Sequence, residues 1–410
     1  MALDRRDFIA GGTLLAASAL TRLAAAAPDD PVKLPSIDAP SEKPKGTAPQ
    51  PRMPSARKGY AVVGIGRIAL EQVLPAFGQS KHAKLVALVS GDAAKAGKIA
   101  AQHGVDPKAI YNYKNFDAIK DNKEIDAVYI ALPNHLHAEF TVRAAQAGKH
   151  VLCEKPAATT SADAQKMVDA CAQAKRKLMI AYRMQYEPMN AYAKKLVRDK
   201  TLGKIKLIEG HNGQNAGGPL DQYRLKKGGG ALLDVGLYCL NTTRYLLGEE
   251  PSWVQAFVYS TPGDPRFKEV DETVVWSMGF PSGTIGNFST TMGAHASRRY
   301  RAYGDKGGFI SMDPAFSYSG LQLEIAQVRG KEEFRERPQI EQKQQFALEL
   351  DHFAKCIEDN KQPYTPGEEG VQDMKIMEAI FQSAREGKRV ELAKITKLDA
   401  FRGPAPEAEG

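Results

Sequence analysis

Cysteine is scarce in this 410-residue chain, and none of its four cysteines belongs to a C-x-x-C pair. The lack of such pairs argues against a structural zinc site or a thioredoxin-type redox centre, and we predict no metal site. Three of the four cysteines lie inside apolar strand or helix patterns. We therefore favour buried thiols over disulfides, because free cysteine is among the most buried residue types.

Blocks of like charge are also lacking, although the formal net charge is +8. The basic residues are scattered, as in the segment Lys194–Lys200, and no RNA-type aromatic motif accompanies them. This distribution is typical of a solvated surface, and we predict no nucleic-acid partner. A composition of 43% hydrophobic and 25% charged residues is that of a soluble globular protein.

Residues 1–27 have the organisation of a bacterial export signal. The paired Arg5 and Arg6 precede the apolar run Gly11–Leu20, and small residues follow at Ala24–Ala27. The apolar run is too short to cross a bilayer as a stable helix. The pattern predicts a twin-arginine signal that the twin-arginine translocation machinery recognises, with cleavage near its end. We expect a periplasmic protein without a membrane anchor, exported after folding.

A proline-rich segment follows at residues 28–58, with eight prolines and few large apolar residues. Such a segment cannot bury a core of its own and favours extended polyproline II conformation. Two interpretations are open: a disordered spacer, or an N-terminal arm that lies along a neighbouring subunit.

Strand and helix patterns alternate over residues 59–181, which predicts a Rossmann-type, doubly wound parallel sheet of the α/β class. The predicted strands are 60–63, 85–89, 127–132, 151–153 and 178–181, and the predicted helices are 92–103, 135–148 and 161–175. Thr160 and Asp163 have the spacing of a capping box at the start of the last helix.

A dinucleotide fingerprint ends the first predicted strand, with the sequence Gly64-Ile65-Gly66-Arg67-Ile68-Ala69. Gly64 permits a tight turn, Gly66 lets the backbone approach a pyrophosphate, and Ala69 allows close packing of helix on strand. The N-terminus of the following helix faces the anion. Because the motif follows a strand and opens a helix, it predicts dinucleotide binding.

The second predicted strand ends at Ser90 rather than at an acid. An acid at this position usually binds the ribose hydroxyls of NAD, whereas a hydroxyl with the nearby Lys95 suits the 2′-phosphate of NADP. Asp92 leaves NAD open, although this residue could instead cap the following helix. We favour NADP.

Two further segments carry candidate catalytic groups. Glu154-Lys155-Pro156 places a lysine at the carboxyl end of a strand, where ligands bind in such sheets. A glycine run at 228–230 precedes Asp234 and Tyr238, which an α-helix would place on one face. Tyrosine is a weak base at neutral pH, and an ammonium such as Lys155 favours its phenolate form. The set suits removal of a proton from a sugar hydroxyl.

Together these motifs resemble the Gfo/Idh/MocA oxidoreductases. The resemblance rests on Gly64-Ile65-Gly66, Pro133-Asn134 with His137, Glu154-Lys155-Pro156, and the helix with Asp234 and Tyr238. Most members carry histidine at the position of Tyr238, and tyrosine there is similar to the periplasmic glucose–fructose branch, which includes aldose–aldose oxidoreductases.

The resemblance implies a second α/β domain over residues 182–410 with a large, mainly antiparallel sheet. Strand patterns at 204–211, 254–260, 273–280 and 284–292 and helical patterns at 342–358 and 369–386 agree with this. It also implies that the outer face of the sheet builds a homodimer or homotetramer, and that the arm at 28–58 embraces a partner subunit near the adenine.

Residue roles also follow from the resemblance. Lys155 and Tyr238 would be catalytic with Asp234 assisting, and Arg183 and Tyr186 would lie toward the sugar. The implied cofactor residues are Gly64, Gly66, Arg67, Ile68, Ala69, Ser90, Lys95, Pro133, Asn134, His137, Glu154 and Lys155. Met184-Gln185 and residues 212–221 depart from the glucose–fructose pattern, which leaves the second sugar open.

An exported enzyme of this kind must keep its cofactor, because the periplasm supplies no nicotinamide dinucleotide. We therefore expect tightly bound NADP(H), oxidation of an aldose at C1 to its lactone, and reduction of a second sugar to a polyol in a ping-pong cycle. Two alternatives remain: an exported NAD-dependent glycosidase with no net redox change, and a non-catalytic cofactor-binding sensor.

Overall fold

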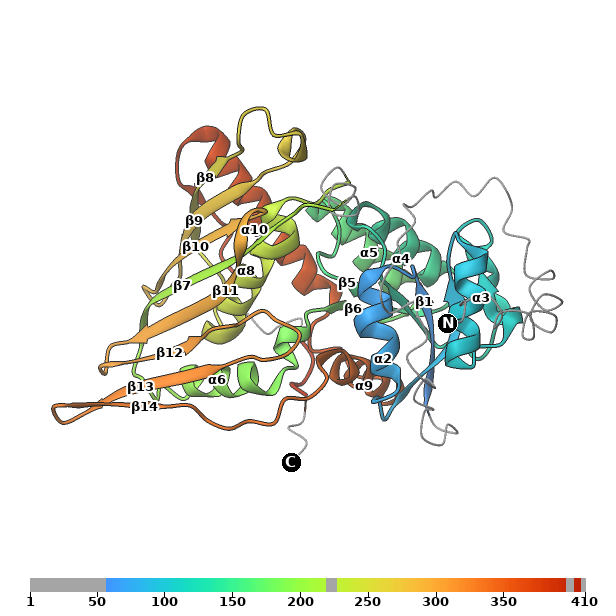
Figure 1. Ribbon diagram of the computed structural model, residues 1–410, viewed down its shortest axis with the longest axis horizontal. Coiled ribbons are helices and arrows are strands. Elements are labelled where there is room, and N and C mark those ends of the chain that lie inside the picture. Colours follow the sequence, from blue (N-terminus) through green and yellow to red (C-terminus); the bar gives the residue numbers. More distant parts are fainter. Residues whose placement is uncertain (1–56, 219–226, 396–401, 407–410) are drawn as a thin grey trace, which may run out of the picture.

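The computed structural model describes residues 57–218, 227–395 and 402–406. The predicted export signal and almost all of the predicted arm lie outside these residues. The described chain builds two sheets that stand beside each other with helices between them (Figure 1). No helix in the described ranges is long and apolar enough to cross a membrane.

The first sheet is parallel, with the strand order β3-β2-β1-β4-β5-β6, which confirms the predicted doubly wound architecture. Its strands are β1 (Lys58–Val63), β2 (Ala83–Val89), β3 (Ile110–Tyr111), β4 (Ala127–Ile130), β5 (His150–Glu154) and β6 (Leu178–Ala181). Helices α2 (Leu74–Phe77), α3 (Ala93–His103), α4 (His137–Gln146) and α5 (Ser161–Gln173) connect them. The strands read as continuous apolar runs because helices cover both faces of the sheet.

Capping side chains mark the starts of α3 and α5 in this domain. Thr160 Oγ1 accepts a hydrogen bond from the Asp163 amide at 3.1 Å, which confirms the predicted capping box. Asp92 caps α3 by accepting from the Lys95 amide at 2.9 Å. The Asp92 carboxylate is therefore committed to the helix start.

The second sheet has nine strands, in the order β14-β13-β12-β11-β7-β10-β9-β8-β15. The pair β7–β10 is parallel and the other pairs are antiparallel, so the predicted mainly antiparallel sheet is confirmed. The strands are β7 (Ile205–Asn215), β8 (Trp253–Tyr259), β9 (Thr273–Gly279), β10 (Ile285–Thr291), β11 (Gly293–Gly304), β12 (Gly308–Met312), β13 (Leu323–Arg329), β14 (Glu332–Glu336) and β15 (Val390–Glu391). The chain pattern had predicted four of these.

The helices of the second half pack between the two sheets (Figure 1). They are α6 (Pro188–Arg198), α8 (Leu237–Leu247), α9 (Gln345–Glu358) and α10 (Gly367–Glu386). Helix α9 returns to the first sheet, where the Leu350 carbonyl accepts from the Tyr60 hydroxyl at 3.4 Å. One continuous hydrophobic core therefore joins both sheets. All four cysteines lie in this described part of the chain as buried free thiols.

Candidate active site

The carboxyl ends of the parallel strands bring the predicted cofactor segments to one edge of the first sheet. Gly64 follows β1 with φ +92°, and a Cβ placed there would lie 2.7 Å from the Ala131 carbonyl oxygen. Only glycine meets both constraints without strain. Ala69 is fully buried, whereas Gly66 and Arg67 remain accessible. This glycine turn, between the first strand and a helix, fits the pyrophosphate of a dinucleotide.

The end of β2 carries the hydroxyl of Ser90, and the nearby carboxylate of Asp92 caps the next helix. Ser90 is buried, and its Oγ accepts from the Asp92 amide at 3.1 Å. The Asp92 carboxylate caps α3 through the Lys95 amide. The end of β2 therefore carries a hydroxyl with a lysine five residues further on, and these residue types fit a 2′-phosphate.

His137 lies inside the protein and ties two loops of the site together. Its Nδ1 is 2.8 Å from the Pro156 carbonyl oxygen, and its Nε2 is 2.8 Å from that of Leu132. Burial lowers the pKa of this imidazole, while the carbonyl oxygens act in the opposite direction. The family resemblance implies a place for His137 among the cofactor residues. The structure gives the ring these carbonyl partners, so it orders the loops that carry Asn134 and Lys155.

Glu154 is buried behind Lys155. It accepts hydrogen bonds from the Tyr129 hydroxyl at 2.8 Å and from the Lys155 amide at 3.2 Å. Burial raises the pKa of its carboxyl group. These bonds fix the end of β5, from which Lys155 extends toward Tyr238.

Lys155 joins the two domains at the centre of the site. Its Nζ donates to the backbone carbonyl of Asp234 at 2.8 Å and lies 4.9 Å from the centroid of the Tyr238 ring. The ammonium thus contacts the ring face. The sequence predicts that this ammonium favours the phenolate form of Tyr238. In the structure, the described hydrogen-bond donor to the Tyr238 hydroxyl oxygen is another residue.

That donor is Arg183, whose Nη2 lies 3.2 Å from the Tyr238 hydroxyl. Arg183 is buried, and it also donates to the backbone carbonyls of Phe316 at 2.7 Å and Ser317 at 3.1 Å. A further hydrogen bond goes to the side chain of Gln345 on α9. Arg183 was assigned to the sugar side, and its position as the partner of the tyrosine hydroxyl was not predicted.

The helix that carries Asp234 and Tyr238 is not α-helical throughout. Residues Leu232–Gly236 form a π turn before α8, which adds one residue to the repeat. The Asp234 side chain is buried, and its Oδ1 accepts a hydrogen bond from Asn134 Nδ2 of the first domain at 3.3 Å. Asn134 also donates to the Gly228 carbonyl at 3.0 Å. Asp234 thus anchors the predicted nicotinamide residue Asn134.

The Tyr186 side chain does not contact the Tyr238 hydroxyl among the described hydrogen bonds. Its side chain is buried, and its hydroxyl shares a 2.8 Å hydrogen bond with Thr365 Oγ1. Its ring packs against His352, with centroids 5.2 Å apart. Within the short turn η6 (Arg183–Gln185) and Tyr186, Arg183 is the side chain that contacts Tyr238.

A glycine turn at the switch point of a parallel sheet, beside a lysine–tyrosine–arginine cluster, defines a nicotinamide-dependent oxidoreductase. Residues 58–182 match the oxidoreductase family with an NAD-binding Rossmann fold, and residues 194–392 match that family's C-terminal alpha/beta domain. The chain belongs to the Gfo/Idh/MocA family.

Relatives that match this chain over most of their own length include enzymes that act on sugars. The structure of aldose-aldose oxidoreductase from Caulobacter crescentus, complexed with glycerol, is 41% identical with a TM-score of 0.78, over 82% of this chain and 100% of that chain. D-xylose 1-dehydrogenase (NADP(+)) of Haloarcula marismortui is 31% identical over 354 residues, which are 81% of this chain and 92% of the relative. D-xylose 1-dehydrogenase (NADP(+)) 2 of Haloferax volcanii is 29% identical over 81% of this chain and 99% of its own.

Proposed function

We propose that this protein is an NADP-dependent sugar oxidoreductase that oxidises an aldose at C1 to its lactone and then reduces a second aldose or ketose to a polyol. The observation that carries the proposal is the cluster of Lys155, Tyr238 and Arg183 at the carboxyl edge of the dinucleotide sheet. The similarity to an aldose-aldose oxidoreductase and to two D-xylose 1-dehydrogenases supports it.

Each side chain of the cluster has a task in this reaction. When NADP is bound, its nicotinamide ring supplies the hydride-accepting and hydride-donating chemistry. As a phenolate, Tyr238 takes the proton from the C1 hydroxyl of the first sugar, and as the resulting phenol it returns that proton to the carbonyl oxygen of the second sugar. Arg183 holds the Tyr238 oxygen in position by its 3.2 Å hydrogen bond. Lys155 fixes the ring plane from the opposite domain.

NADP rather than NAD is supported by the groups at the end of β2. Ser90 offers a hydroxyl, Lys95 lies in the first turn of α3, and the nearby Asp92 carboxylate accepts a hydrogen bond from a backbone amide. Asp92 is the N-cap of α3, and Ser90 and Lys95 are the residues proposed to bind the 2′-phosphate.

Export in folded form would let the protein carry its cofactor to the periplasm, where the cofactor must stay bound through both half-reactions. The paired Arg5 and Arg6, the short apolar run and the alanines before residue 28 support twin-arginine export to the periplasm. A free nicotinamide pool is absent there, so the second sugar must regenerate NADP in place. This requirement is the basis of the ping-pong cycle.

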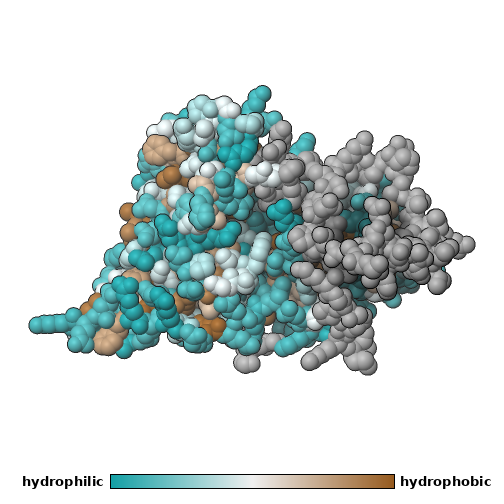
Figure 2. Space-filling model, viewed as in Figure 1, coloured by the Kyte–Doolittle hydropathy of each residue, from teal (hydrophilic) through white to brown (hydrophobic). Residues whose placement is uncertain are grey.

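We also propose a homo-oligomer built on the outer face of the nine-stranded sheet. Phe257 and Tyr259 on β8 are 68% and 61% exposed, and Val275 and Ile285 on the next two strands are 47% and 44% exposed. Figure 2 shows hydrophobic patches among hydrophilic residues on the side of the molecule where this sheet lies. Phe257 and Val275 are direct neighbours across β8 and β9, and exposed apolar pairs of this kind support a protein–protein interface on this face.

Isotope transfer between two sugars tests the proposed reaction. The full chain, expressed with its export signal and purified from the periplasm, is mixed with C1-deuterated glucose and an unlabelled second aldose, without added cofactor. We expect deuterium in the polyol formed from the second sugar over many turnovers. A reaction that needs stoichiometric added NADP would contradict the cycle, and release of free sugar from an aryl glycoside would favour the glycosidase alternative.

A further inference from the structure

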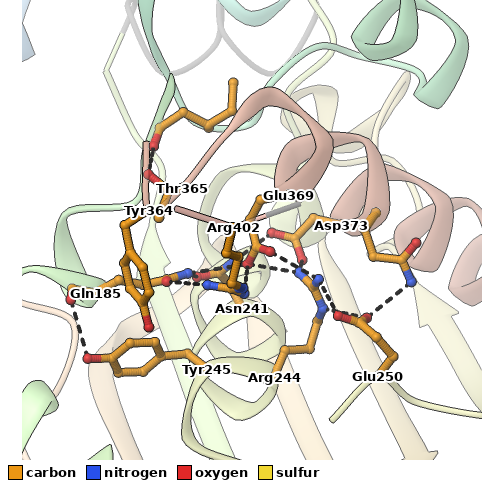
Figure 3. A network of polar contacts seen from close by, with 12 residues as sticks. Gln185, Asn241, Arg244, Tyr245, Glu250, Tyr364, Thr365, Glu369, Asp373 and Arg402 are labelled. Carbon is orange, nitrogen blue, oxygen red and sulfur yellow. Dashed lines mark hydrogen bonds and ion pairs between the residues drawn. The ribbon is translucent and has the colours of Figure 1, made fainter. Parts of the chain in front are cut away.

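A polar network lies buried between α8 and α10, close to the candidate active site (Figure 3). Arg402, from the C-terminal segment 402–406, inserts into it with 3% of its side chain exposed. Its Nη2 pairs with Glu369 Oε1 at 2.6 Å, and its Nη1 donates to Gln185 Oε1 at 2.9 Å. A residue near the end of the sequence thus reaches the turn that carries Arg183.

The network needs a second cation. Arg244, which is fully buried, pairs with Glu250 at 2.6 Å and with Glu369 at 3.2 Å, and it also contacts Asp373. Among the described residues of this network, three carboxylates therefore surround one central guanidinium. Burial raises the pKa of Asp373 to about 6, whereas Arg244 and Arg402 outweigh burial at Glu369 and lower the pKa of its carboxyl. Arg402 supplies the additional positive charge.

The same network connects the two elements that hold the catalytic pair. Gln185 lies in the turn that contains Arg183, and Asn241 lies one turn along α8 from Tyr238. Gln185 Nε2 donates to Asn241 Oδ1 at 2.7 Å, and Asn241 Nδ2 donates to Glu369 Oε1 at 3.1 Å. Movement of Gln185 against Asn241 would therefore change the distance between the Arg183 guanidinium and the Tyr238 hydroxyl.

We infer that Arg402 is a positioning residue, which fixes the hydrogen bond between Arg183 and the Tyr238 hydroxyl through Gln185, Glu369 and Asn241. This inference rests on the proposed sugar oxidation at that site. It gives the C-terminal segment a role in the chemistry, although the segment belongs to neither sheet.

The C-terminal segment is built to hold Arg402 in place. The Gly403 amide donates to the Pro363 carbonyl at 2.9 Å, and a Cβ at Gly403 would lie 1.7 Å from the Gln362 carbonyl oxygen. The guanidinium also lies 5.5 Å from the centroid of the Tyr364 ring. Beside it is a cavity of about 280 Å³, lined by Lys194, Arg198, Tyr364, Arg402, Gly403 and Ala405. A small cation can enter through this cavity when the Arg402 side chain is truncated.

The test compares Arg402→Ala, Arg402→Lys and the control Arg335→Ala in the full chain with its bound cofactor. Arg335 pairs with Glu333 on the exposed strand β14, so its truncation removes an arginine of the same size outside the network. The measurement is the single-turnover rate at which glucose, or the aldose that works best, reduces the bound cofactor, well below the unfolding temperature. We expect Arg402→Ala to lower this rate about tenfold with the aldose KM within about twofold of the native value.

Rescue separates positioning from a general loss of stability. Millimolar guanidinium should restore most of the lost rate to Arg402→Ala and leave Arg335→Ala unchanged, whereas equal concentrations of sodium chloride should not. Arg402→Lys keeps the charge without the fork that binds Gln185 and Glu369 together, so we expect a stable protein with an intermediate rate. It serves as the second variant if Arg402→Ala does not fold. A native rate in Arg402→Lys together with no guanidinium rescue would overturn the inference.

Hydrogen exchange tests the same inference without any assay of activity. In Arg402→Lys we expect faster amide exchange in residues 183–187 and 237–245 than in the native protein, with no change in the strands of the first sheet. Unchanged exchange in both segments would overturn the positioning role. If exchange rises but no aldose reduces the bound cofactor of the native protein, the proposed function fails while the structural link stands.

Discussion

Replacing Tyr238 by phenylalanine should remove the chemistry and leave the fold. The hydroxyl makes one described hydrogen bond, from Arg183 at 3.2 Å, and Arg183 keeps its bonds to the carbonyls of Phe316 and Ser317. Loss of this one hydrogen bond costs about 1 kcal/mol of unfolding free energy. The ring stays, packed with its centroid 5.7 Å from that of Phe316 and with Lys155 over it.

The cost to catalysis should be far larger. A positioned general base contributes about 10²–10⁴-fold in rate. At about 1.36 kcal/mol for each tenfold, the barrier for aldose oxidation should rise by about 3–5 kcal/mol. Stopped-flow absorbance of the bound cofactor, mixed with aldose, measures this directly, and urea unfolding measures the stability.

The matched control is Tyr303→Phe. The Tyr303 hydroxyl donates to Glu209 Oε1 at 2.8 Å on the second sheet, away from the cluster. It should lose a similar or smaller amount of stability and retain the native rate. Tyr238→Phe with a reduction rate within about threefold of native would refute the assignment of this hydroxyl as the base.

Three further predictions follow from other contacts. Lys155→Met loses the 2.8 Å bond to the Asp234 carbonyl and the cation over Tyr238, so the single-turnover rate should fall by at least about 10²-fold, while the amount of cofactor released on denaturation stays native; a rate within threefold would count against it. Ser90→Asp places a carboxylate at the end of β2, so the ratio of NADP to NAD recovered from denatured protein should fall by about tenfold, and an unchanged ratio would argue that the 2′-phosphate binds elsewhere. Burial lowers the pKa of His352 to about 4, below its unfolded value of 6.5, so its stabilising effect is complete above pH 6.5 and is lost as the pH falls toward 4. Urea unfolding near pH 7 and near pH 4.5 should show that His352→Gln removes about 2 kcal/mol of this pH dependence, and an equal dependence in the variant would disprove the assignment.

The first domain could be predicted from sequence because its signals are local. The turn at Gly64 requires a glycine, the buried strands are short apolar runs, and Thr160 and Asp163 are three residues apart. Each of these constraints is satisfied by neighbours in the chain, so the pattern alone specifies the element. The two-residue strand β3 (Ile110–Tyr111) is too short to leave such a pattern.

The second sheet was predicted only in part for the same reason. All five residues of β14 are exposed, so its sequence Glu-Glu-Phe-Arg-Glu has no buried face to mark it as a strand. Strand β11 alternates in its second half alone, because its first residues lie at the surface. Pairing with a neighbouring strand, rather than burial, defines these segments.

The candidate site shows the same limit at the level of single contacts. The sequence singled out Lys155, Arg183, Asp234 and Tyr238 as candidates. It did not predict which of their atoms are in contact. Arg183 and Tyr238 are 55 positions apart, and Arg402 lies 217 positions from Gln185. The π turn at Leu232–Gly236, which carries Asp234, was not predicted either. Contacts over such separations depend on the packing of both domains, which no local pattern encodes.

One spectrum tests the central claim most directly. The mature protein is purified without added cofactor, and its absorbance is recorded before glucose, after glucose and after a second sugar. We expect a rise in the reduced-nicotinamide band on adding glucose or another aldose, and its reversal by the second sugar. A protein that releases a nicotinamide dinucleotide on denaturation, yet shows no rise with any aldose, would contradict it.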